Sequence, residues 1–275
     1  MIGDELHFLT EFNEFEKHPN ILAFLGNPHD RSKIISEYPE GGTLQNFVRK
    51  FHGQNFDNYL DKEGGYNKTN TFLDNNLSSL STFDLLSFAY QIANGMRFLA
   101  GEEFFHRLLT LQNIFITANK TIKIGNFSLA RKRGNNQYYK LATFDLPIPP
   151  THRAPETFEN SEKRFTEQSD VWSYGVTLFE LFSLGKEPYK GIETDVKSYV
   201  NGGGRLEKPE YCHQKIYDLM LQCWNIEPFQ RPVFSKCMGV LEHHMERHGL
   251  QLKDQIDQKL EISMENLQHL EGWRM

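Results

Sequence analysis

Residues His106 to Asn113 read HRLLTLQN, and the interpretation of the whole chain depends on them. Two short apolar segments follow, Ile114–Ile116 and Ile122–Ile124, with an Asn-Lys pair between them. Apolar runs separated by turn residues at this spacing predict a β-hairpin. A second motif, GNFSLAR from Gly125 to Arg131, comes directly after the hairpin.

The region before this stretch contains several short predicted elements. Leu, Phe and polar residues alternate at helical spacing over residues 4–17, which predicts an amphipathic helix. Ile21–Leu25 and Lys33–Glu37 are apolar runs on either side of a Gly-Asn-Pro turn signal and predict two strands. A Gly-Gly pair then precedes Thr43, which is placed to cap a helix over Leu44–Lys50.

Residues 52–80 are rich in Asn, Asp, Gly and Ser, and we interpret them as a flexible surface insert. Ser81 and Asp84 after the insert have the spacing of a helix capping box. The following segment, Phe83–Leu99, has apolar residues along one helical face and predicts an amphipathic helix.

The second half of the chain is predicted to be helical. Val171–Phe182 is apolar almost all round, which is typical of a buried helix. Residues 246–275 are predicted to form a helical C-terminal tail, because an apolar stripe at helical spacing follows Arg247. We interpret this stripe as a packing face.

Composition excludes several classes of function. The chain has 275 residues and a net charge of −6, which argues against a broad nucleic-acid surface. Its three cysteines have no metal-binding spacing and an odd count, which suits a reducing compartment. The acidic N-terminus lacks the apolar core of a signal peptide, and no run of eighteen apolar residues predicts a membrane span.

The chain from residue 4 to about residue 245 resembles the protein tyrosine kinase domain, in the style of receptor kinases of the fibroblast and vascular growth factor type. Several segments match in order and at suitable separations: His18–Ile21, Ser36–Tyr38, the loop His106–Asn113, Gly125–Arg131, the pair Tyr138-Tyr139, Ala154–Glu156, Asp170–Val176, Cys223-Trp224 and Gln230–Pro232. The polar insert lies where split receptor kinases have theirs. Each motif is weak alone, and together they are specific.

The resemblance implies an α+β kinase-like fold with a nearly complete helical C-lobe and a truncated N-lobe. Residues 1–39 would be the remnant of the N-lobe, with a regulatory helix, two strands and the hinge. Residues 40–245 would form the C-lobe, including the insert at 52–80, and residues 246–275 a helical tail.

The same resemblance shows which parts of the chemistry are altered. His106 and Arg107 match the catalytic loop H-R-D-x-x-x-x-N, but Leu108 stands where an Asp would accept the proton of the attacked hydroxyl. Asn126 replaces the metal-binding Asp of D-F-G. Asn113 remains as the other candidate metal ligand, and we expect it to act as a structural hydrogen-bonding residue.

The nucleotide-binding motifs are also incomplete in this sequence. No G-x-G-x-x-G loop and no V-A-I-K strand occurs in it. Ser36 and Glu37 match the gatekeeper and the hinge, but Pro39 stands where a backbone N–H would bind adenine, and proline has no N–H. Phe115 occupies the position of a smaller Leu on the adenine floor, and its bulk should shrink the pocket.

Other matching positions are structural or regulatory. Glu156 and Arg231 match a buried ion pair that ties the activation segment to the C-lobe. Asp170 matches the residue that accepts backbone N–H bonds from the His106-Arg107 turn. Tyr138 and Tyr139 match paired activation-loop tyrosines, for which phosphorylation by an active kinase and two unmodified exposed side chains are the open alternatives.

Three hypotheses follow. The first is a pseudokinase that acts in signalling as a scaffold or allosteric partner, without a cofactor and with a protein partner such as an active tyrosine kinase. The second is a tyrosine-protein kinase that uses ATP and Mg²⁺ and whose N-lobe is incomplete here. The third is nucleotide binding without transfer. We expect a cytoplasmic location for the chain as written, and the plasma membrane for a longer receptor form.

Overall fold

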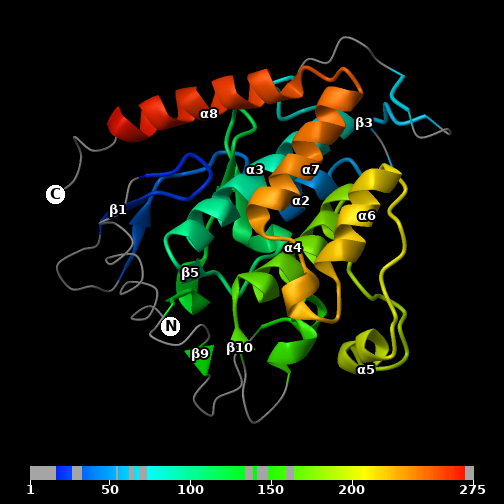
Figure 1. Ribbon diagram of the computed structural model, residues 1–275. Coiled ribbons are helices and arrows are strands. Elements are labelled where there is room, and N and C mark those ends of the chain that lie inside the picture. The colour runs from blue at the N-terminus through cyan, green and yellow to red at the C-terminus, as the bar shows by residue number, and fades with distance from the viewer. Residues whose placement is uncertain are drawn as a thin grey trace.

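The computed structural model describes residues 17–26, 33–53, 55–61, 65–67, 73–133, 139–140, 148–158 and 164–269 (Figure 1). The strands are β1 (Phe24–Gly26), β2 (Ile35–Ser36), β3 (Phe56–Asp57), β4 (Leu80–Ser81), β5 (Phe104–Phe105), β6 (Ile114–Ile116), β7 (Ile122–Ile124), β8 (Arg131–Lys132), β9 (Tyr139–Lys140) and β10 (Arg164–Phe165). The α-helices are α2 (Leu44–Arg49), α3 (Thr82–Gly101), α4 (Glu167–Phe182), α5 (Val196–Asn201), α6 (Gln214–Cys223), α7 (Phe234–Arg247) and α8 (Leu252–His269). Short 3₁₀ turns are η1 (Leu111–Asn113), η2 (Phe127–Leu129), η3 (Pro150–His152), η4 (Pro155–Thr157) and η5 (Pro228–Gln230).

Helices α3 and α4 form the centre of the molecule, with α6 and α7 packed beside them (Figure 1). The predicted capping box begins α3, because the Ser81 N–H donates to Asp84 Oδ2 at 2.9 Å and the Asp84 N–H donates to Ser81 Oγ at 3.3 Å. The prediction that Val171–Phe182 is buried is confirmed within α4, where Trp172 and Tyr174 are fully buried. The Tyr174 hydroxyl donates to the Ala89 carbonyl at 2.9 Å and joins α4 to α3.

The strands form short two-stranded ladders, so the fold is α+β with a dominant helical part. The predicted hairpin is confirmed, with β6 and β7 antiparallel and Phe115 opposite Lys123. The two predicted early strands pair as β1 and β2, also antiparallel. The Leu22 N–H donates to the Ile124 carbonyl at 2.8 Å, which attaches the segment before β1 to the hairpin.

The insert at residues 52–80 is held more closely than its polar composition indicates. Its strand β3 pairs in parallel with β4, and Phe56 packs against Tyr211 with ring centroids 4.6 Å apart. Tyr59 stacks on Phe83 of α3 at 4.8 Å, and Leu73 is buried. A few aromatic and apolar residues therefore anchor the described part of this surface insert to the helices.

Helix α8 confirms the predicted C-terminal helix and its packing face. Ile256, Leu260 and Leu267 are buried, and the helix crosses over α3 and α7 (Figure 1). The Lys17 ammonium donates to the Leu267 carbonyl at 2.9 Å, and the Leu73 N–H donates to Gln255 Oε1 at 2.8 Å. Helix α8 thus connects the early part of the chain and the insert to the helical body.

Some expectations fall on residues outside the described ranges. Apart from Lys17, the helix predicted over residues 4–17 lies outside them, as do Tyr138 and the side chain of Tyr139. Among the helices that the structure does describe, none combines the length and the apolar composition needed to cross a bilayer.

Candidate functional site

The loop after β5 turns sharply at Arg107, whose φ of +67° is in the left-handed region. A non-glycine residue in this region costs of order 1–3 kcal/mol, and the conformation persists only where surrounding contacts offset that cost. Asp170 of α4 supplies that support, because its two carboxylate oxygens accept the N–H groups of His106 and Arg107, both at 2.8 Å. Burial raises the pKa of Asp170 to about 7, against the effect of these two hydrogen bonds. The role expected for Asp170, holding this turn, agrees with the geometry.

His106 is buried and links the loop to the segment after β7. Its Nε2 lies 3.0 Å from the Gly125 carbonyl, and its Nδ1 accepts the Leu108 N–H at 3.2 Å. A carbonyl only accepts and an amide N–H only donates, so the ring is the neutral tautomer with the proton on Nε2. Burial lowers the pKa of His106 to about 4, which is consistent with a neutral ring. Its ring also contacts Phe127 edge-on at 5.3 Å.

The Leu108 side chain lies in an apolar environment. It packs against a small buried cluster formed by Leu129, Ile148 and Phe165. The neighbouring Arg107 places its guanidinium 4.3 Å from the centre of the Phe165 ring. Leu108 has no group that accepts a proton, and it is used for packing.

Asn113, Asn126 and Ser128 form an uncharged chain of hydrogen bonds. Asn113 Nδ2 donates to the Leu108 carbonyl at 2.8 Å, and Asn126 Nδ2 donates to Asn113 Oδ1 at 2.8 Å. The Ser128 hydroxyl in turn donates to Asn126 Oδ1 at 2.8 Å. Asn126 has φ +56° and ψ +69°, a left-handed conformation that Asn adopts more readily than most residues.

The hydrogen-bonded group of Asn113, Asn126 and Ser128 is a poor fit to Mg²⁺. Mg²⁺ in proteins is usually held by one or two carboxylates together with phosphate oxygens and water. Asn113 and Asn126 offer only neutral amide oxygens, and each of these oxygens already accepts a hydrogen bond from its neighbour. Asn113 and Asn126, the two candidate metal ligands, lie side by side, but a metal there would be bound by neutral oxygens without a carboxylate.

The segment Ser36–Pro39 lies beside the β6–β7 hairpin, and Glu37 is turned inward. Glu37 Oε1 accepts the Ala23 N–H at 2.7 Å and pairs with the Lys123 ammonium at 3.1 Å. Burial lowers the pKa of Lys123, and the Glu37 carboxylate opposes that effect. The carbonyl of Pro39 accepts the Gly42 N–H at 3.2 Å. The ion pair fixes this segment against β7, and sequence reasoning did not identify Lys123.

Phe115 of β6 lies over the backbone of Gly125. A Cβ at position 125 would come within 2.9 Å of the Phe115 ring and 3.0 Å of the Leu22 side chain, so only glycine fits there without a shift. The Phe115 ring and the Leu22 side chain both pack closely against Gly125.

Glu156 and Arg231 form a bidentate ion pair. Each guanidinium NH group donates to one carboxylate oxygen at 2.8 Å. Arg231 also donates to the Gln168 and Asn225 carbonyls and lies 5.0 Å from the Trp172 ring centre. The pair predicted from the sequence is therefore brought together, and it connects the η4 turn with the loop before α7.

A second buried side-chain pair, His152 and Glu180, was not predicted from the sequence. His152 Nε2 lies 3.0 Å from Glu180 Oε2, and both residues are almost fully buried. The same carboxylate oxygen accepts the Leu111 N–H at 3.1 Å, so Glu180 joins η3 to η1. A signal for this pair was present, because a glutamate within an otherwise apolar buried helix needs a polar partner.

Comparison with known proteins gives a consistent picture. The family model described as "Protein tyrosine and serine/threonine kinase" matches residues 4–241. The chain belongs to this kinase family.

Relatives of this kinase domain are named as receptors. It is 39% identical to the receptor-like tyrosine-protein kinase kin-15 of Caenorhabditis elegans over 99% of the chain and 59% of that protein. It is 37% identical to the tyrosine-protein kinase receptor old-1 of the same species over 99% of the chain and 53% of that protein. It is 42% identical to platelet-derived growth factor receptor alpha of Takifugu rubripes over 66% of the chain and 17% of that protein. The chain is thus a receptor tyrosine kinase-like kinase domain that spans about half the length of the first two of these relatives.

Within this kinase domain, the predicted positions divide into two groups. His106, Asn113 and Asn126 meet around the β6–β7 hairpin, and Glu156 meets Arg231. The Leu108 side chain packs against the apolar cluster, and only its backbone bonds to the polar groups. The domain keeps the polar contacts that hold the loops in place.

Proposed function

We propose that this receptor tyrosine kinase-like domain transfers no phosphoryl group and acts in signalling as a scaffold or allosteric partner of another protein, an active tyrosine kinase being the first candidate. The observation that supports it most directly is Leu108, which stands where the family's catalytic loop has an Asp. That Asp accepts the proton of the substrate hydroxyl, and a positioned acid or base typically contributes about 10²–10⁴-fold in rate.

The metal and nucleotide positions support the same proposal. Catalysis of phosphoryl transfer is mostly positioning and charge stabilisation, which requires carboxylates and bound cations. Asn113 and Asn126 supply neutral oxygens that already accept hydrogen bonds. Pro39 has no N–H to offer an adenine ring, and the Phe115 ring fills space over Gly125. On this proposal the domain works without ATP or Mg²⁺.

Some observations favour the alternative, a weakly active tyrosine-protein kinase. Asn113 keeps its place beside the hairpin, and the loop geometry set by His106 and Asp170 is intact. The Glu156–Arg231 pair is intact as well. In this alternative ATP and Mg²⁺ are the cofactors, and protein tyrosine is the substrate.

A kinase assay distinguishes the inactive scaffold from the weakly active kinase. The purified chain is incubated with Mg²⁺, ATP and a generic tyrosine peptide, alongside an Asn113→Ala variant prepared identically. We expect equal signals at the level of the blank for both. Turnover in the wild type that disappears in Asn113→Ala would establish the enzyme and overturn the pseudokinase proposal.

Nucleotide binding without transfer has its own measurement. We expect the melting temperature to be unchanged by ATP, with or without Mg²⁺. A rise with ATP would show a nucleotide-binding scaffold in place of a cofactor-free one.

The regulatory proposal concerns Tyr138 and Tyr139. We propose that an active tyrosine kinase phosphorylates them, which would add negative charge close in sequence to Lys132 and Arg133. Incubation with such a kinase followed by mass spectrometry should find phosphate on one or both residues, and Tyr138→Phe with Tyr139→Phe should remove it. Because the relatives are named as receptors, a longer form would place this domain at the plasma membrane.

A further inference from the structure

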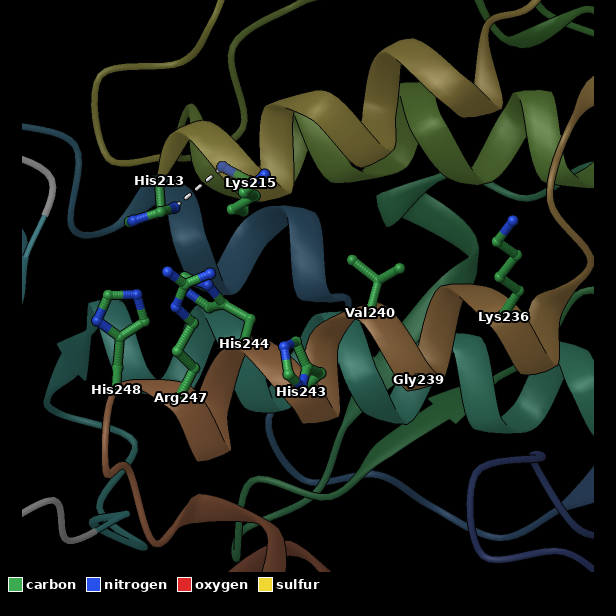
Figure 2. A pocket seen from close by; sticks show the side chains of 9 residues that line it. All are labelled: His213, Lys215, Lys236, Gly239, Val240, His243, His244, Arg247 and His248. Atoms are coloured by element: carbon green, nitrogen blue, oxygen red, sulfur yellow. Dashed lines mark hydrogen bonds between the residues drawn. The ribbon is translucent and has the colours of Figure 1, made fainter.

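A cavity of about 600 Å³ lies between the start of α6 and one side of α7, along which it extends from Lys236 to His248. None of the candidate-site residues described above lines it. Figure 2 shows His244 and His248 rising from α7, while His213 faces them from the start of α6. The proposed function leaves this group of side chains without a role.

The three imidazoles converge closely. One nitrogen of each of His213, His244 and His248 lies within 4.8 Å of those of the other two. The ring centroids are 4.4, 4.7 and 5.2 Å apart. His244 and His248 are four residues apart, and this spacing places both on the same face at the end of α7. Imidazole nitrogens in such an arrangement are common ligands of transition metals.

Two of the rings already have hydrogen-bond partners, one within α6 and one from the insert. His213 Nδ1 accepts the Lys215 N–H at 3.0 Å as the N-cap of α6, which leaves the proton of the neutral ring on Nε2 (Figure 2). Binding of a metal by His213 therefore requires this cap bond to be released. The Tyr66 hydroxyl bonds to His244 Nε2 at 2.8 Å. The bond to Tyr66 leaves Nδ1 of His244 as its metal-binding nitrogen, and a partner on the second ring nitrogen is typical of ligating histidines.

The distances are close to those of a zinc site. Zn–N bonds of 2.0–2.1 Å in a tetrahedral site place the nitrogens about 3.3 Å apart. The nitrogens of this cluster are separated by up to 4.8 Å, so closure requires movement of at most about 1.5 Å. His213 and His248 are only half-buried, so rotation of their side chains can supply this movement.

Some charges around the three histidines favour a bound cation, and others oppose it. Burial, and then His213, His248 and Arg247, lower the pKa of His244 to about 3, and a neutral imidazole is the form that binds metal. The C-terminal end of the α7 dipole favours a cation. Arg247 and the lysines Lys215 and Lys236 also line the cavity and oppose one. All three are exposed, so their long side chains can turn toward solvent.

We propose that His213, His244 and His248 bind a divalent transition-metal ion, with Zn²⁺ as the preferred ion, and leave a fourth position for water or another ligand. Three neutral nitrogen ligands with one open position suit Zn²⁺. Tyr66 belongs to the insert, and it contacts all three rings at centroid distances of 5.2–6.0 Å. The ion therefore fastens the insert, α6 and α7 to one another.

The test uses the untagged full chain with Zn²⁺ and with Co²⁺ as a spectroscopic substitute. We expect one Zn²⁺ per chain by calorimetry, visible bands of tetrahedral Co²⁺, and a higher melting temperature with Zn²⁺. His248→Gln should weaken Zn²⁺ binding more than about 100-fold, because loss of an outer-shell partner alone costs about 10–100-fold. His243→Gln is the matched control, since His243 is exposed on the same helix and lines the cavity without joining the cluster.

Arg247→Gln separates a metal site from an anion site. Removing this positive charge should tighten Zn²⁺ binding at a metal site, and it should weaken binding of inorganic phosphate at an anion site. Absence of Co²⁺ bands, equal Zn²⁺ affinity in His248→Gln and His243→Gln, or phosphate binding that is lost in Arg247→Gln would each overturn the proposal.

Discussion

Changing Asn126 to Asp tests whether the hydrogen bonds among Asn113, Asn126 and Ser128 require an amide at position 126. The Asn113 side chain lies between two partners, with Nδ2 donating to the Leu108 carbonyl and Oδ1 accepting from Asn126. A carboxylate at position 126 cannot donate, so it would place one oxygen acceptor against another. Rotating the Asn113 amide does not help, because Oδ1 would then face the Leu108 carbonyl.

The expected cost follows from these contacts. Asn126→Asp loses one hydrogen bond of 2.8 Å and leaves a partly buried acceptor unsatisfied, which costs about 1–3 kcal/mol. For a chain of 275 residues this lowers the melting temperature by about 2–5 °C. Ser128→Ala is the control, because it removes only the hydroxyl bond to Asn126 and should cost about 0.5–1.5 kcal/mol.

The assay is thermal unfolding in EDTA and in millimolar Mg²⁺. In Asn126→Asp, Mg²⁺ should restore part of the lost stability, because the new carboxylate and Asn113 Oδ1 would then offer it two oxygens. Wild type and Ser128→Ala should respond to Mg²⁺ equally little. The reasoning is refuted if Asn126→Asp is as stable as wild type in EDTA, or if Mg²⁺ stabilises the wild type as much as the variant.

Three further changes test other contacts. Glu156→Ala leaves the fully buried Arg231 side chain without its carboxylate and should lower the free energy of unfolding by about 3–5 kcal/mol in urea, with partial recovery on adding Arg231→Met. Leu108→Asp moves a carboxylate into an apolar cluster and should cost about 1–3 kcal/mol while kinase activity stays at the blank. Burial lowers the pKa of His18 to about 3 in the folded chain, whereas the unfolded chain keeps the ordinary value of about 6.5. Between these two pH values the unfolded chain binds one more proton than the folded chain, so the free energy of unfolding falls as the pH drops from about 6.5 toward 3. His18→Asn, which keeps an acceptor for the Asn20 N–H, should flatten this dependence by up to about 1.4 kcal/mol per pH unit.

The sequence predicted the elements whose patterns are local. The hairpin at Ile114–Ile124 and the capping box at Ser81 depend on residues close together in the chain, and both are present. The Glu156–Arg231 pair joins residues 75 positions apart, and only the family resemblance indicated it.

The contacts that the sequence did not reveal involve side chains whose partners are distant. Lys123 alternates with two isoleucines in β7 and has the pattern of an exposed strand residue, yet it is buried against Glu37. The polar composition of the insert gave no sign of the aromatic contacts that attach it to the helices. Tyr59 and Tyr66 are a small fraction of that segment, but each packs on Phe83 and together they hold it in place.

The bond between Lys17 and Leu267 has a consequence for the order of folding. The two residues are 250 positions apart, and closing a free loop of that length costs about 5 kcal/mol, more than one hydrogen bond returns. Helix α8 therefore docks only after the helical body has brought its two sides together. At 5–20 residues per second, the ribosome finishes α8 roughly 10–50 s after Lys17 is made. From the completion of α3 until α8 docks, the surface of α3 that α8 covers is exposed to solvent.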